Sequence, residues 1–155
     1  MDEDLLSKEE QKALSEVAHE PEISRPAVLL VDDDEAFREL LAEVFHIHGI
    51  LCFPADGVES AIRLLKKRAT ISLIVTDLRM GPSGGLELVR WVRESERSEL
   101  PVVIMSGQAD MQDAIEAMHL NVIDFLLKPV DLQNMLSVVR RELHIEDQPA
   151  PDSGV

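Results

Sequence analysis

The chain has 155 residues, a formal net charge of −15 and a single cysteine, Cys52. It is long enough for one domain with its own core, and one cysteine excludes an intrachain disulfide or a thiolate metal cluster. The negative charge disfavours binding to nucleic acid or to an anionic membrane, since phosphates attract clustered Lys and Arg. No apolar run approaches the ~18 residues that span a bilayer, and the N-terminus is acidic, unlike a secretory leader. We therefore expect a cytoplasmic protein without a membrane or nucleic-acid surface.

The two ends of the chain differ in composition from its middle. Residues 1–26 are polar, and Ser7 followed by Glu10 has the spacing of a capping box, so this extension is expected to be either a short helix or disordered. Residues 146–155 have the composition of a disordered tail. The structured domain is therefore expected over residues 27–145.

The middle of the chain alternates short apolar runs with amphipathic helical patterns. The apolar runs predict strands at 27–31, 50–53, 72–75, 101–105 and 122–127. Continuous apolar strands that alternate with helices indicate a parallel sheet with both faces covered. Five such units in about 119 residues favour an open doubly wound α/β domain over an eightfold barrel.

The helical patterns also predict which side chains pack inward. The predicted stripes are Phe37, Leu40, Leu41, Val44 and Phe45; Val58, Ala61, Ile62, Leu65 and Ala69; Met111, Ile115 and Met118; and Leu132, Met135, Leu136, Val139 and Leu143. Helices near 86–95 and 109–119 have less regular patterns than the others.

Polar side chains follow the predicted strands, at the edge of an open parallel sheet where ligands bind. They are Asp32, Asp33, Asp34, Asp77, Ser106 and Lys128. Each has an ordinary alternative: an aspartate can cap the next helix, as we expect of Asp34, or begin a turn, and a lysine can lie on the surface. Several carboxylates at one edge repel one another, however, and a hard cation such as Mg²⁺ relieves that repulsion.

The same residue types fit phosphoryl transfer. A carboxylate can attack phosphorus and form an aspartyl phosphate without a general base. The transition state spreads charge over the phosphoryl oxygens, which Mg²⁺, Lys128 and the Ser106 hydroxyl would stabilise.

Four segments carry a resemblance to a known family. VLLVDDDEAFRELL (28–41), LIVTDLRM (73–80), PVVIMSGQAD (101–110) and DFLLKPVD (124–131) are similar, in this order, to the motifs of response-regulator receiver domains of two-component signalling. The resemblance runs from about Ala27 to Leu143 and implies a flavodoxin-like (βα)5 fold with strand order 2-1-3-4-5.

The resemblance also implies a function and partners. Asp77 would accept a phosphoryl group from a sensor histidine kinase or a histidine phosphotransfer protein, so the chain would act on itself and not as an enzyme with a separate substrate. Asp33 would bind Mg²⁺ directly, with Asp32 helping directly or through water. Asp77 and the main-chain carbonyl of Arg79 would complete the protein ligands.

The remaining family positions concern the phosphoryl group and the output. Ser106 and Lys128 would contact the phosphoryl oxygens, and the Lys128–Pro129 peptide is expected to be cis. Phe125 occupies the aromatic switch position that couples to Ser106. The expected output is a changed surface on the fourth helix, fifth strand and fifth helix, read by an effector protein or a second copy of the chain.

One loop departs from the family pattern. Residues 80–85 read MGPSGG, where the family usually has proline directly after the methionine and an acid or amide before the final glycine. With Gly84 and Gly85 adjacent, we expect a looser start to the following helix.

Three other protein classes are alternatives to this interpretation. A haloacid-dehalogenase-type phosphatase would have D-x-D-x-T after the first strand, but residues 32–36 read DDDEA. A flavodoxin would have a Ser/Thr/Gly-rich phosphate loop there. A phosphorylation-independent pseudo-receiver, which acts only as an interaction module, stays the main alternative, although such chains usually lack part of the acidic set or the lysine.

Overall fold

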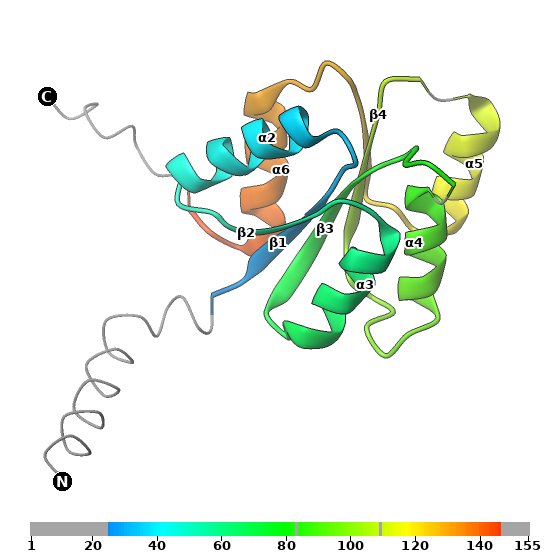
Figure 1. Cartoon of the computed structure of the whole chain (residues 1–155), viewed down its shortest axis with the longest axis horizontal. Helices are drawn as coiled ribbons and strands as arrows, with labels where there is room; N and C mark the ends of the chain where they lie inside the picture. Colours follow the sequence, from blue (N-terminus) through cyan, green and yellow to red (C-terminus); the bar gives the residue numbers. More distant parts are fainter. Residues whose placement is uncertain (1–24, 83, 109, 147–155) are drawn as a thin grey trace, which may run out of the picture.

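The computed structural model of this chain describes residues 25–82, 84–108 and 110–146 (Figure 1). The sequence-based predictions for residues 1–24 and 147–155 lie outside the described residues. Within residues 25–146 no helix combines the length and the apolar character needed to cross a membrane.

The described residues form one parallel sheet. Its strands are β1 (Ala27–Val31), β2 (Leu51–Ala55), β3 (Ile71–Asp77), β4 (Val102–Ser106) and β5 (Asp124–Leu127), in the order β2-β1-β3-β4-β5. Every residue of β1 is buried, because strands flank it on both sides and helices cover both faces. The sequence AVLLV is continuously apolar for this reason. The predicted fold class and strand order are confirmed.

Helices cover the two faces of the sheet unequally (Figure 1). Two helices, α2 (Glu35–Ile47) and α6 (Leu132–Leu143), pack on one face through one core cluster. Three helices, α3 (Val58–Lys67), α4 (Gly85–Arg93) and α5 (Met111–His119), pack on the other through a second cluster. Two layers of helices around a sheet give the chain two apolar cores, one on each side.

Aspartates begin three of these helices. The carboxylate of Asp34 accepts a hydrogen bond from the N–H of Phe37, as the sequence predicted for this cap. Asp110 forms a capping box at the start of α5, and Asp131 caps α6. Such caps satisfy N–H groups that the first turn of a helix leaves without partners.

The strand register brings the ends of four strands to one edge. Val31 pairs with Thr76, Asp77 with Met105, and Ser106 with Leu127. The residues at or just after these positions therefore lie near one another although they are far apart in the sequence.

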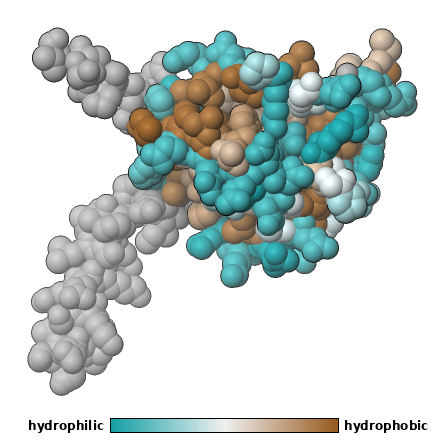
Figure 2. Space-filling view, turned by 45° about the horizontal axis from the view of Figure 1, so that its top comes forward, coloured by the Kyte–Doolittle hydropathy of each residue, from teal (hydrophilic) through white to brown (hydrophobic). Residues whose placement is uncertain are grey.

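The prediction that Met111, Ile115 and Met118 of α5 pack inward is wrong. Met111, Ile115 and Met118 are 76%, 40% and 73% exposed, and Ala117 is the buried residue of this helix. α5 lies toward the β5 edge of the sheet, at the right of Figure 1, where little sheet remains for it to cover. On the face drawn in Figure 2, apolar surface occurs in patches that hydrophilic side chains separate.

Three smaller corrections concern other stripes, the first being Leu132, which is 37% exposed at the first residue of α6. Leu40 in α2 is 56% exposed, so this side chain lies at the margin of the buried face. Ala69 is exposed because α3 ends at Lys67, two residues before it.

Candidate functional site

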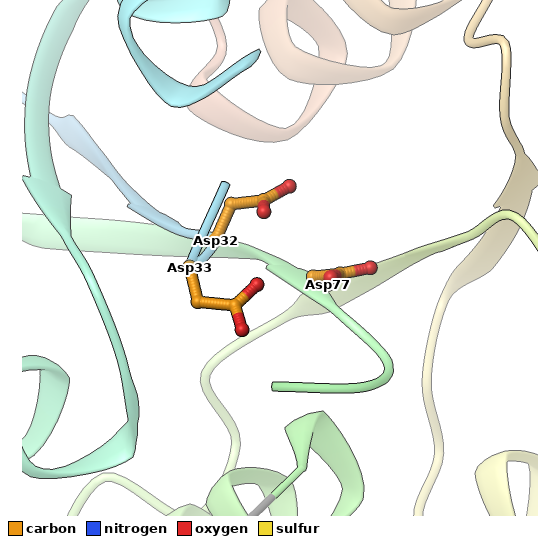
Figure 3. Close-up of side chains that lie close together, drawn as sticks. All are labelled: Asp32, Asp33 and Asp77. Atoms are coloured by element: carbon orange, nitrogen blue, oxygen red, sulfur yellow. The ribbon is translucent and has the colours of Figure 1, made fainter. Parts of the chain in front are cut away.

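Three carboxylates meet at the carboxyl edge of the sheet (Figure 3). Asp32 and Asp33 follow β1 directly, and Asp77 is the last residue of β3. One oxygen from each carboxylate lies within 4.8 Å of the others. Asp32 and Asp77 are buried and Asp33 is exposed, so the cluster opens to solvent on the side of Asp33.

Lys128 is the cation of this cluster. Its Nζ lies 2.9 Å from Oδ2 of Asp32 and 3.5 Å from Oδ1 of Asp77. The Nζ also stands 4.4 Å from the centroid of the Phe37 ring, a cation–π contact. The backbone N–H of Lys128 donates to the carbonyl of Ser106 at 2.7 Å, which joins the end of β5 to the end of β4. The Lys128–Pro129 peptide is cis.

Asp32 is held from several directions. Its Oδ1 accepts the N–H of Asp34 at 2.8 Å, and its Oδ2 accepts from Lys128. Its carbonyl accepts from the guanidinium of Arg38 at 2.7 Å. Both carboxylate oxygens therefore have donors, which offsets the cost of burying this side chain.

The surroundings of the cluster raise the pKa of both Asp77 and Lys128, which disfavours the charged form of the acid and favours that of the lysine. Burial raises the pKa of Asp77, and the charge of Asp32 raises it further, against the lowering effect of Lys128. Burial alone lowers the pKa of Lys128, but hydrogen bonds and charges from Asp32 and Asp77 outweigh it and leave this pKa above its ordinary value. The lysine is therefore protonated at neutral pH, and a second cation would offset the repulsion between the carboxylates.

Ser106 and Phe125 lie on neighbouring strands. Ser106 is almost fully buried at the end of β4, and its Oγ accepts the N–H of Gln108 at 3.0 Å. Phe125 pairs with Ile104, two residues before Ser106, so the two side chains lie on the same face of the sheet. Phe125 is half-buried and packs against the core under α4 and α5.

The loop after Asp77 fits closely between β3 and α4. The N–H of Leu78 donates to the carbonyl of Met105 at 2.8 Å, and the N–H of Gly85 donates to the carbonyl of Leu78 at 2.9 Å. A Cβ on Gly85 would stand 2.4 Å from the carbonyl oxygen of Asp77, and one on Gly84 would stand 2.6 Å from that of Leu78. Only glycine allows this approach without movement of the backbone.

The side chain of Arg79 leaves this loop toward α5. It forms an ion pair with Asp113 at 2.6 Å. Two further arginines join α4 to α5: Arg90 pairs with Glu116, and the Nε of Arg93 donates to the carbonyl of Leu120 at 2.7 Å. Polar contacts thus attach a helix that buries little apolar surface.

The structure brings together the predicted residues Asp32, Asp33, Asp77 and Lys128, and it places Ser106 at the end of the adjacent strand. Sequence reasoning missed the contact of Phe37 with Lys128, since Phe37 was assigned only to the core stripe of α2. Its place three residues after Asp34, at the start of a helix that begins beside the cluster, was the available signal.

Comparisons with known proteins agree with this geometry. The family model described as the response regulator receiver domain matches residues 28–140. The regulatory protein VirG of Agrobacterium tumefaciens is 34% identical over 119 residues, which are 76% of this chain and 43% of VirG. The response regulator protein FleR of Pseudomonas aeruginosa is 33% identical over 74% of this chain and 24% of FleR. The chain thus spans less than half the length of these curated relatives.

A solved structure extends the similarity to three dimensions. The crystal structure of a response regulator receiver protein from Pseudomonas putida is 47% identical, with a TM-score of 0.74, and the match covers 76% of this chain and 98% of that one. The region that the family model matches contains the acidic cluster and all but the first residue of the sheet. The family model and these relatives, together with the strand order and the acidic edge, show that the chain belongs to the response regulator receiver domain family.

Proposed function

We propose that Asp77 accepts a phosphoryl group from the phosphohistidine of a sensor kinase or a histidine phosphotransfer protein, in a reaction that requires Mg²⁺. The observation that carries the proposal is the cluster itself: Asp77 has two other carboxylates within 4.8 Å and the ammonium of Lys128 at 3.5 Å. In the transfer, the phosphorus–nitrogen bond of the donor breaks while an Asp77 oxygen bonds to phosphorus. The proposed receiver unit covers residues 27–145, and its proposed location is the cytoplasm.

The donor set fits a magnesium ion. Magnesium prefers oxygen ligands, and the cluster offers carboxylates from three residues, of which Asp33 is open to solvent. Asp33 and Asp77 would bind the ion directly, with Asp32 directly or through water and the main-chain carbonyl of Arg79. When bound, the ion would supply positive charge against that of the incoming phosphoryl group.

The other residues of the site would act on the phosphoryl oxygens. An ionised Asp77 needs no base, so catalysis consists of positioning and charge stabilisation. Lys128, whose raised pKa keeps it protonated, would pair with one oxygen. The hydroxyl of Ser106, whose oxygen accepts the N–H of Gln108, keeps its own proton to donate to another.

Phosphorylation would then change a surface for a protein partner. Ser106 would move toward the phosphoryl group and Phe125 would fill the space that it leaves. This change would bias the surface of α5, β5 and α6, where Met111, Met118 and Leu127 are 76%, 73% and 65% exposed. An effector protein or a second copy of the chain would read the altered surface.

Intact mass spectrometry tests the proposal. The chain is incubated with acetyl phosphate or a phosphorylated kinase, with and without Mg²⁺. One added phosphoryl group is expected, lost in Asp77→Asn and in EDTA. Absence of the adduct in Mg²⁺ would support the pseudo-receiver alternative, and an adduct that survives Asp77→Asn would assign another acceptor.

A further inference from the structure

The far end of the sheet from the acidic cluster carries a groove. It has a volume of about 590 Å³ and lies between the C-terminal ends of α3 and α4. Its apolar side chains are Leu65, Ala69 and Trp91. In Figure 1 the two helices lie next to each other on the same face of the sheet.

The groove is fixed before anything binds to it. Arg97, one of its lining residues, donates to the carbonyls of Leu65, Arg68 and Ala69 at 3.0, 3.2 and 3.3 Å. These bonds satisfy carbonyls at the end of α3 and hold the following turn to the loop that follows α4. Little order would have to be created when the groove is filled, which favours binding.

The groove carries more basic than acidic side chains, with Lys66, Lys67 and Arg97 against Glu96, in a strongly acidic chain. Residues 63–68 read RLLKKR, whereas the whole chain has a net charge of −15. Lys66 and Lys67 are exposed, and neither forms an ion pair with any residue that the structure describes. Their place at the C-terminus of α3 suits the helix dipole, but the dipole alone leaves both ammonium groups free for a carboxylate partner.

A segment of the same chain has the complementary character. Residues 1–24 hold eight acidic and two basic side chains, and Leu14, Val17 and Ala18 form an apolar stripe at helical spacing. The segment joins the domain beside the groove, because the N–H of Ala27 donates to the carbonyl of Thr70 at 3.1 Å and Thr70 follows Ala69. The seven residues from 19 to 25 can span about 23 Å when extended, enough to place the stripe over the groove.

We propose that the acidic segment 1–24 docks in this groove, with its apolar stripe against Trp91 and its carboxylates beside Lys66 and Lys67. The interaction is intramolecular, so the short connection to Ala27 gives a high effective concentration and a modest contact is enough. This docking is independent of phosphorylation at Asp77.

The test uses the fluorescence of Trp91, which is the only tryptophan of the chain. Acrylamide quenching is measured on the full chain, because a neutral quencher is indifferent to the charge changes. One variant carries Lys66→Glu and Lys67→Glu, and a second carries Leu14→Asp and Val17→Asp. Arg141→Glu is the control: its side chain is 61% exposed on α6, on the other face of the sheet.

In both the lysine variant and the Leu14/Val17 variant the quenching constant should rise about twofold, since the indole of Trp91 loses the cover over its outer face. Arg141→Glu should leave it unchanged. Equal quenching in every chain would overturn the proposal. So would a rise in the lysine variant alone, because the segment would then not be what covers Trp91. Quenching that depends on protein concentration would overturn it as well, by showing that the occupant comes from a second copy.

Discussion

Replacing Gly85 by alanine tests whether the loop after Asp77 sets the geometry of the site. The new Cβ would lie 2.4 Å from the carbonyl oxygen of Asp77 and 3.2 Å from Cγ2 of Thr76, where real contacts of this kind are essentially never below 3.0 Å. The Asp77 backbone and the start of α4 must therefore separate by at least about 0.6 Å, and overpacking of this kind costs about 1–3 kcal/mol. Alanine recovers about 0.5–1 kcal/mol through its better helix propensity. The net expectation is a loss of up to about 2.5 kcal/mol in the free energy of unfolding.

Urea unfolding, followed by circular dichroism, measures this loss, and Gly57→Ala is its control. Gly57 also stands at the start of a helix, α3, but a Cβ there has no atom within 4 Å. Its substitution should cost only about 0.5–1 kcal/mol, the difference between a glycine and an alanine cap, because the new Cβ meets no neighbouring atom. Phosphotransfer to Asp77 should slow in Gly85→Ala and not in Gly57→Ala, because only the first displaces the acceptor's backbone. Equal stability and equal phosphotransfer in the two variants would refute the reasoning.

Three further predictions concern other parts of the chain. Lys128→Ala should slow phosphotransfer while circular dichroism shows an intact fold; an unchanged rate would mean that the positive charge is dispensable. Arg90→Ala should lower the free energy of unfolding by less than about 1 kcal/mol, as expected for an exposed ion pair with Glu116, yet speed amide exchange in α5. Amide exchange in α5 that stays as slow as in the wild type would show that this ion pair does not hold the helix. Burial raises the pKa of the Cys52 thiol to about 12, which lowers its thiolate fraction about a thousandfold. Iodoacetamide at pH 8 should therefore label Cys52 only after unfolding, and rapid native labelling would contradict this.

The strands and the acidic cluster could be predicted because burial imposes simple patterns. A central parallel strand such as β1 must be apolar throughout, so the change from apolar residues to Asp32 marks its end in the sequence. All strands of a parallel sheet point the same way, and the side chains that follow them must meet at one edge. The cap at Asp34 was visible for a similar reason, as it precedes the first apolar residue of α2.

The surroundings of α5 could not be predicted in the same way. Helical spacing shows that Met111, Ile115 and Met118 share a face, but not whether another element covers that face. Strand order decides it: β5 is the edge of the sheet and α5 lies near it, so only Ala117 is buried. The close approach of Gly84 and Gly85 to carbonyl oxygens is likewise a property of the folded loop, because adjacent glycines alone suggest freedom and not tight packing.

The raised pKa of Asp77 makes a prediction about stability and pH. Its carboxyl group binds a proton more tightly in the folded chain than in the unfolded one. The folded state therefore gains from protonation at low pH and loses that advantage as pH rises from the ordinary carboxyl range through the raised pKa. At pH 7 the charged Asp77 destabilises the fold, and each tenfold difference in proton affinity between the folded and unfolded chains corresponds to ~1.4 kcal/mol.

Asp77→Asn removes this cost, so the variant should be more stable than the wild type at pH 7, with a difference that shrinks as the pH falls toward the ordinary carboxyl range. Urea unfolding at a series of pH values measures the difference, first without a divalent ion. Added Mg²⁺ should then stabilise the wild type more than the variant, because a ligand that binds only the folded state adds stability and the variant lacks one ligand charge. A variant that is less stable than the wild type at pH 7 without Mg²⁺ would show that Lys128 already compensates the charge of Asp77, and the electrostatic reason for a second cation would disappear.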